Sequence, residues 1–213
     1  SSFGNKPVTK GIDICDEPII YNNADKTMAI ILLDTPGLFD TNTDQFTTIT
    51  IFGLATLFSS YMIYNIDKRI QEDTLQNLAL FTEYAKLASK KNKDRMLLPI
   101  INIFVRDYQS FDSEIGDIKA YCNNYIEDIL KKRNNNELDS TRDIIKEYNF
   151  KCCVFPHPGF EVIKKDKKIV SDIFTDDFKK YTDYYISNIK TELVSSAKPF
   201  VKSDYIFLVE KFV

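Results

Sequence analysis

Short apolar segments alternate along this chain with longer segments whose apolar residues follow helical spacing. The short apolar segments lie at residues 28–33, 60–66, 96–105 and 150–155. Helices are expected at residues 47–58, 72–91, 113–133, 137–147 and 176–193. Because strands that alternate with helices tend to pair in parallel, the pattern predicts an α/β fold, a mostly parallel sheet with helices on both faces.

The segment at 29–40, Ala-Ile-Ile-Leu-Leu-Asp-Thr-Pro-Gly-Leu-Phe-Asp, carries the first functional signal. Its apolar residues 30–33 predict a strand buried on both faces, as in a parallel sheet. The strand ends at Asp34, and Pro36 with Gly37 forces a turn. Asp-x-x-Gly after such a strand is the pattern of nucleotide hydrolases, in which the Asp holds Mg²⁺ and the Gly N–H approaches a terminal phosphate. A plain strand-to-loop turn is the alternative interpretation.

The third and fourth apolar segments also end in polar or turn-forming residues. Arg106 and Asp107 follow one, and Pro-His-Pro-Gly at 156–159 follows the other. In a parallel sheet these two ends and that of Asp34 lie at the same edge, so we expect one shared crevice. It would combine magnesium chemistry with a carboxylate that accepts hydrogen bonds. A salt-bridged strand end is the alternative for Arg106 and Asp107, and His157 is interpreted as a rigid-turn residue.

Composition limits the classes of function. With 213 residues, 44% hydrophobic and 28% charged, the chain fits one ordinary globular domain. A net charge of −3 and a pI near 5.3 argue against an electrostatic grip on nucleic acid, so no such partner is expected. One histidine and four cysteines without Cys-x-x-Cys spacing disfavour a histidine-based metal site, and Cys152 and Cys153 are expected as reduced thiols in the core. The uncharged stretch 45–66 changes its apolar period midway, which predicts a helix and a strand instead of a membrane span.

Three segments carry a resemblance to a known family. They are Ile-Gln-Glu-Asp-Thr-Leu-Gln-Asn-Leu-Ala-Leu-Phe-Thr-Glu-Tyr-Ala-Lys-Leu-Ala at 70–88, Phe-Val-Arg-Asp at 104–107 and Pro-His-Pro-Gly-Phe-Glu-Val at 156–162. Together they resemble the large-GTPase domain of the atlastins and, more distantly, that of the guanylate-binding proteins. The similarity runs from about Thr9 to about Lys202. It implies a P-loop GTPase-like, dynamin-superfamily fold, GTP hydrolysis with Mg²⁺, GTP-dependent homodimers, and fusion of endoplasmic reticulum membranes from their cytoplasmic face.

The resemblance also implies roles at the phosphate end of the nucleotide. Thr9 matches the switch threonine, which ligates Mg²⁺ and contacts the γ-phosphate; a simple loop hydroxyl is the alternative. Asp34 would hold Mg²⁺ through a water, and Gly37 would sense the γ-phosphate. Pro36 stands where atlastins carry Gln and guanylate-binding proteins carry Glu, so any side-chain role in ordering water is lost.

Other matched residues would bind the base. Asp107 would accept two hydrogen bonds from guanine N1–H and N2–H₂, a donor pair that adenine lacks. Arg106 would pack along the base, and Val162 would contact the purine. Lys165 departs from the uncharged polar residue expected at its position.

The sequence departs from the family at its start. None of its six glycines stands in the P-loop pattern Gly-x-x-x-x-Gly-Lys-[Ser/Thr], whose backbone and lysine hold the phosphates. We therefore expect residues 1–202 to be a GTPase domain that lacks its first strand, P-loop and helix. Residues 203–213 would begin a C-terminal helix that leads toward a missing middle domain. On this interpretation the isolated chain is inactive and poorly soluble, and membrane association comes only through missing downstream segments.

Two alternatives remain open at this stage. In the first, the chain is a degenerate, non-hydrolysing interaction module of GTPase-like fold, favoured by the absent P-loop motif. In the second, it is a relative of the soluble guanylate-binding proteins and would be cytoplasmic. The atlastin-like segment at 70–88 argues against the second alternative.

Overall fold

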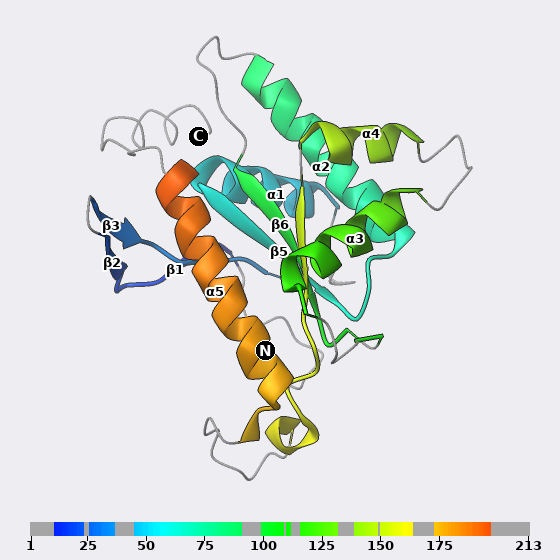
Figure 1. The fold of residues 1–213 in the computed structure, drawn as a ribbon. Helices are drawn as coiled ribbons and strands as arrows, with labels where there is room; N and C mark the ends of the chain where they lie inside the picture. The colour runs from blue at the N-terminus through cyan, green and yellow to red at the C-terminus, as the bar shows by residue number, and fades with distance from the viewer. Residues whose placement is uncertain are drawn as a thin grey trace.

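The computed structural model describes residues 11–23, 26–36, 45–90, 99–108, 110–111, 116–131, 139–148, 150–163 and 173–196 (Figure 1). Its main sheet has three strands, β5 (Tyr61–Asp67), β6 (Ile100–Arg106) and β7 (Lys151–Val154), in the order β5-β6-β7. Both strand pairs are parallel. The predicted parallel sheet, with strands that alternate with helices, is therefore confirmed.

The helices also follow the apolar spacing of the sequence. They are α1 (Gln45–Phe58), α2 (Glu72–Lys90), α3 (Ile118–Lys131), α4 (Asp139–Glu147) and α5 (Asp176–Ser196), with a short 3₁₀ turn, η2, at Phe160–Ile163. Glu72 and Asp73 lie in the first turn of α2, where negative charge is favourable. The uncharged stretch 45–66 divides into α1 and β5, as its change of period predicts. No described helix is long and apolar enough to cross a membrane.

Helices cover both faces of the parallel sheet. Tyr64 and Ile103 are in register, so their side chains share one face, and Phe52 of α1 meets the Tyr64 ring at a centroid distance of 6.4 Å. Phe104 points to the opposite face, where its ring lies 5.0 Å from that of Tyr185 in α5. In Figure 1 α5 accordingly crosses the front of the sheet and α1 lies behind it.

Most of the core comes from the strands and helices around this sheet. Its fully buried side chains belong to Leu78, Thr82, Ile103, Val105, Ile145, Val154 and Tyr181. One polar residue, Asn102, is buried in the middle of β6. Its Nδ2 donates a 2.8 Å hydrogen bond to the Tyr61 hydroxyl, whereas its Oδ1 has no partner among the described residues. The amide therefore depends on one contact across the sheet.

The segment 28–33 differs from the prediction of a doubly buried, parallel strand. β3 (Lys26–Ile30) forms an antiparallel hairpin with β2 (Ile19–Asn23), and β4 (Leu33–Asp34) pairs antiparallel with β1 (Asp13–Ile14). Ile31 and Leu32, between the strands, are 60% and 51% exposed. The prediction was wrong because an apolar run indicates a strand without specifying the neighbours that cover it.

The two ends of the expected GTPase domain remain predictions. Residues 1–10 and 203–213 lie outside the described part of the chain, and so does Lys165. The expectation of poor solubility for the isolated chain also stays a prediction. The exposed apolar side chains on and between the strands of the two small sheets are those of Ile14, Ile19, Ile20, Ile31 and Leu32.

Candidate functional site

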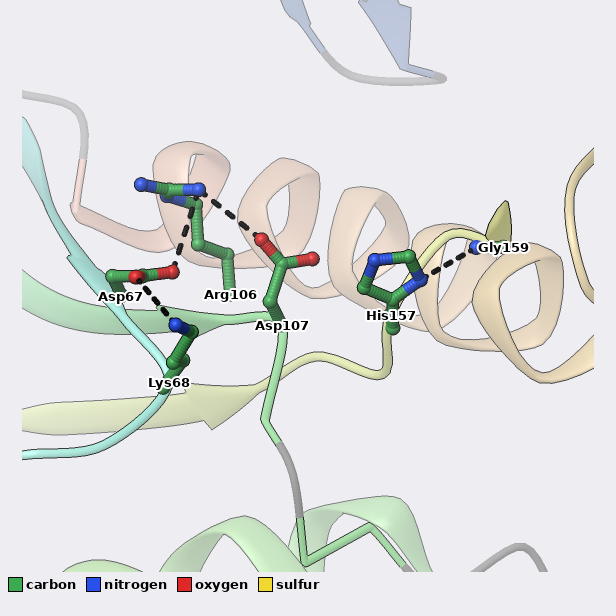
Figure 2. Close-up of polar contacts among 6 residues, drawn as sticks. All are labelled: Asp67, Lys68, Arg106, Asp107, His157 and Gly159. Atoms are coloured by element: carbon green, nitrogen blue, oxygen red, sulfur yellow. Dashed lines mark hydrogen bonds and ion pairs between the residues drawn. The ribbon is translucent and has the colours of Figure 1, made fainter. Parts of the chain in front are cut away.

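The carboxyl ends of β5 and β6 bring three charged side chains together. The Arg106 guanidinium lies 3.1 Å from Asp107 Oδ2 and 3.5 Å from Asp67 Oδ1. Figure 2 shows it between the two carboxylates, with Lys68 on the far side of Asp67. The Asp107 side chain is 26% exposed, and that of Arg106 is 50% exposed. The predicted alternative of a salt-bridged strand end is thus present in the structure, and it leaves the remaining acceptor sites of Asp107 available to a ligand.

The backbone at these two strand ends is unusual. Lys68 and Asp107 have φ angles of 60° and 54°, in the left-handed region that residues other than glycine rarely adopt. The Lys68 N–H donates to the Arg106 carbonyl at 2.8 Å, which extends the β5–β6 ladder as far as this kink. Such conformations cost about 1–3 kcal/mol each and concentrate at functional sites.

The neighbouring strand continues the same edge. The Phe155 N–H donates to the Val105 carbonyl at 2.7 Å, and the Tyr108 N–H donates to the Phe155 carbonyl at 2.9 Å. Phe155 is buried among aromatic rings, including those of Phe104 and Tyr185. The chain after β7 is therefore fastened beside Asp107, as the prediction of a common edge requires.

The loop after β7 is held by its own contacts. His157 Nδ1 accepts a hydrogen bond from the Gly159 N–H at 3.0 Å, so in this arrangement the ring proton is on Nε2 (Figure 2). Gly159 has φ of 118°, and a Cβ there would lie 3.2 Å from the Ile173 carbonyl oxygen. The Thr175 N–H donates to the Pro158 carbonyl at 3.1 Å. These contacts confirm His157 as a rigid-turn residue.

Two residues of the segment that resembles the base-bordering loop, Phe160 and Val162, lie in η2, and Val162 is the one expected to contact the purine. Val162 is half-buried, and its N–H donates to the Gly159 carbonyl at 3.3 Å. Phe160 is 81% exposed, and its ring lies 5.1 Å from that of His157. An exposed aromatic side chain on a fixed loop was not singled out from the sequence, because neighbours in sequence give no sign of its exposure.

The predicted magnesium residues lie elsewhere in the fold. Asp34 ends β4, which belongs to a separate two-stranded sheet, so the expectation that three strand ends share one parallel sheet was wrong. Pro36 follows it and is half-buried. Thr9 and Gly37 lie outside the described residues. An open hollow of about 410 Å³ at Asp34 is lined by Asp13, Ile14, Cys15, Leu32, Leu33 and Asp34.

The carboxylates at this hollow suit a divalent cation. Asp13 and Asp34 are directly opposite across the β1–β4 ladder, so their side chains lie on the same side of it. Two like charges in that position repel each other, and Mg²⁺ prefers carboxylate and water oxygens. No group of three or more potential metal-ligating side chains occurs in the described ranges. The pair therefore fits a hydrated Mg²⁺ that takes further ligands from a phosphate or from water.

Asp67 and Lys68 are the site residues that the sequence interpretation missed. They end the apolar segment 60–66 as Arg106 ends the next strand, and that parallel was the available signal. The charged run at 67–69 was not distinguished from an ordinary solvated turn.

Comparison with known proteins places the chain among its relatives. A family model described as the N-terminal domain of guanylate-binding proteins matches residues 2–198. The chain belongs to this family. Atlastin-1 of Rattus norvegicus is 34% identical over 192 residues, which is 88% of this chain and 33% of that protein. Atlastin-2 of Xenopus laevis is 35% identical over 184 residues, which is 81% of this chain and 31% of that protein.

A third relative extends the similarity to insects. Atlastin of Drosophila melanogaster is 38% identical over 160 residues, which is 69% of this chain and 27% of that protein. The predicted resemblance to the atlastins and the predicted fold class are therefore confirmed for this family member. The chain spans about a third, or less, of the length of these relatives.

Proposed function

We propose that this chain is the greater part of a domain that binds and hydrolyses GTP in an atlastin-like large GTPase. The observation that carries the proposal is the position of Asp107. It lies at the carboxyl end of a parallel strand, next to the fixed loop after β7, and its backbone is left-handed. This edge is where α/β sheets bind ligands.

Guanine would be selected by hydrogen bonding. Both oxygens of the Asp107 carboxylate can accept, one from N1–H and the other from N2–H₂ of the base. Arg106 binds only Oδ2, and an ionised carboxylate has about four acceptor sites, so the ion pair and the base can coexist. Adenine would leave the carboxylate without these donors, at a cost of about 1–3 kcal/mol. Phe160 and Val162, in η2 after the loop that follows β7, are proposed to contact the base.

Hydrolysis would need a cation beside the phosphates. Asp34, with Asp13 opposite it, would hold Mg²⁺, which supplies charge neutralisation during attack of water on the γ-phosphate. Thr9 and Gly37 are proposed to act with them, as the switch hydroxyl and as the backbone contact to the γ-phosphate. The task of this chain is thus to orient the base and to place acceptors for the cation.

The test exchanges one atom of the base-reading side chain. In the intact protein, Asp107→Asn should weaken GTP binding by roughly ten- to a hundredfold and improve binding of xanthosine triphosphate, whose C2 carbonyl can accept from the new amide. Calorimetry with both nucleotides and Mg²⁺ measures the two affinities. Asp128→Asn, on the exposed side of α3, is the matched control and should change neither.

Unchanged GTP affinity in Asp107→Asn would overturn the base-reading role. Binding without turnover in the unmodified intact protein would instead favour the non-hydrolysing interaction module. The two outcomes separate recognition of the nucleotide from its hydrolysis.

We further propose that GTP drives homodimerisation and the fusion of endoplasmic reticulum membranes by the intact protein. The support is the 34–38% identity to atlastins over most of this chain. Analytical ultracentrifugation of the intact protein with a non-hydrolysable GTP analogue tests dimerisation, and lipid mixing between reconstituted vesicles tests fusion. A protein that hydrolyses GTP but stays monomeric and mixes no lipid would contradict this finer proposal and leave the GTPase activity standing.

A further inference from the structure

Two buried thiols face each other between α3 and β7. Cys122 Sγ lies 3.9 Å from Cys153 Sγ, and both residues are 3% exposed. All four cysteines of the chain carry free thiols in this structure. The pair belongs neither to the sheet edge that carries Arg106 and Asp107 nor to the hollow at Asp13 and Asp34. The proposed GTPase chemistry does not use it.

The two thiols have different environments. Cys122 Sγ and Cys153 Sγ share a sulfur–sulfur hydrogen bond of 3.9 Å, and the interaction with Cys153, followed by the hydrogen bond with the Val154 backbone, lowers the pKa of the Cys122 thiol. The interaction with Cys122, together with burial, raises the pKa of the Cys153 thiol. Burial likewise raises the pKa of Cys152. Cys122 is thus the better nucleophile of the pair, since the thiolate is the reactive form.

The neighbouring Cys152 is not in a position to compete. Successive residues of a strand point to opposite faces, so Cys152 and Cys153 face away from each other. Cys152 lies in register with Ile103, and Cys153 lies in register with Phe104. The pairing is therefore specific to Cys122 and Cys153.

We propose that Cys122 and Cys153 are an oxidisable pair that hydrogen peroxide converts into a disulfide joining α3 to β7. The Cys122 thiolate attacks one peroxide oxygen, the O–O bond breaks, and the released hydroxide takes a proton to form water. The Cys153 sulfur then displaces the oxygen of the Cys122 sulfenic acid, which leaves as a second water with the thiol proton. Two thiols and one peroxide become one disulfide and two waters.

Disulfide formation requires only a limited movement of the two sulfur atoms. A disulfide has an S–S length of about 2.05 Å, so the sulfurs approach by roughly 2 Å through side-chain rotation and a small shift of α3. Because both residues are buried, the reaction depends on a small oxidant or on local opening of the helix. A bulky thiol reagent should therefore label the exposed Cys15 first.

The disulfide would lie close to the sheet edge that carries Asp107. Cys153 is two residues before Phe155, whose backbone holds Val105 and Tyr108 on either side of Arg106 and Asp107. A covalent link at Cys153 would fasten this end of β7 to α3. The inference goes beyond GTP hydrolysis and does not depend on it.

The test is peptide mapping of the intact protein after peroxide treatment. Free thiols are alkylated under denaturing conditions, the protein is digested without reduction, and linked peptides are identified by tandem mass spectrometry. We expect a peptide that joins Cys122 to Cys153 and is lost on treatment with dithiothreitol. Cys152→Ala should keep the link, whereas Cys122→Ala and Cys153→Ala should lose it.

A second readout separates chemistry from misfolding. In Cys153→Ser, the hydroxyl can still donate a hydrogen bond to Cys122 Sγ but cannot resolve its sulfenic acid, so dimedone should trap that sulfenic acid; circular dichroism shows whether the variant is folded. The wild-type measurement decides even where a variant fails to fold. The proposal is overturned if peroxide oxidises Cys15 while Cys122 and Cys153 stay alkylatable, or if the link joins Cys122 to Cys152.

Discussion

Lys68 and Asp107 leave two adjacent parallel strands through the same left-handed backbone conformation, with φ angles of 60° and 54°. The residues before them, Asp67 and Arg106, are in register and form an ion pair. The hydrogen bond from the Lys68 N–H to the Arg106 carbonyl ties the two kinks together. The edge that presents Asp107 is thus built from two strained positions and not from one.

Replacing Lys68 by glycine should release the strain at its position. We expect Lys68→Gly to raise the free energy of unfolding by up to about 1 kcal/mol, because glycine adopts positive φ without steric cost. Asp128→Gly, at an exposed position in the interior of α3, should lower it by a few tenths of a kcal/mol up to about 1 kcal/mol. Urea unfolding followed by circular dichroism measures both. A loss of stability in Lys68→Gly would mean that the lysine contacts outweigh the strain.

The carboxylate pair Asp13 and Asp34 makes a prediction that depends on the cation. In EDTA, Asp13→Asn should stabilise the protein by about 0.2–1 kcal/mol, because it removes a like charge directly across the ladder. With millimolar Mg²⁺ the wild type should gain stability and the variant should gain less, since one ligand is missing. Thermal melts of both proteins in the two buffers give the comparison. Equal gains would contradict a cation site at this pair.

The buried amide of Asn102 predicts that one substitution lowers the stability of the protein and that a second substitution restores it. Tyr61→Phe removes the acceptor of the Nδ2 bond and should cost about 1–3 kcal/mol of stability. Adding Asn102→Leu should recover much of that loss, because the amide that lost its acceptor is then no longer present. Tyr21→Phe, on the hairpin, serves as the matched control and should stay within about 0.5 kcal/mol of the wild type. The midpoints of chemical denaturation of the wild type and the three variants test this prediction.

Buried tyrosines predict alkaline unfolding. Burial, with a further contribution from Asp73, raises the pKa of Tyr64 well above 10, and burial raises that of Tyr125 to about 12. The unfolded chain loses these protons near pH 10 while the folded state keeps them. Their contribution to stability is therefore complete below pH 10 and declines as the pH rises above it.

The corresponding experiment compares urea unfolding at several values between pH 8 and pH 11. In Tyr64→Phe the decline above pH 10 should be shallower by about 1.4 kcal/mol per pH unit than in the wild type. An identical slope in the two proteins would show that Tyr64 titrates normally.

The sequence interpretation succeeded where periodicity and burial coincide. In α2, Leu75 and Leu78 lie on the buried stripe that the helical spacing indicates. In β6 and β7 continuous apolar runs gave parallel strands whose polar ends, at Arg106 and at 156–159, meet at one edge. Local pattern and tertiary environment agree at these positions, so the pattern alone was enough.

It failed where the outcome depends on neighbours far along the chain. Residues 30–33 have the same apolar character as β6, yet Ile31 and Leu32 are exposed because the strands around them pair in two-stranded ladders. Likewise, Asp67 gained significance only through Arg106, which lies 39 residues later and pairs with it across the sheet. The local sequence does not specify which distant strand a segment pairs with.

The amide of Asn102 also limits how the sheet can assemble. A strand composed only of Ile, Phe and Val could slide against its neighbours at little cost, since one apolar contact resembles another. With an amide at its centre, β6 has a single low-cost alignment, the one that brings Nδ2 to the Tyr61 hydroxyl. Every misaligned pairing would bury that amide among apolar side chains without a hydrogen-bond partner. This one hydrogen bond therefore favours the register that fixes the position of Asp107.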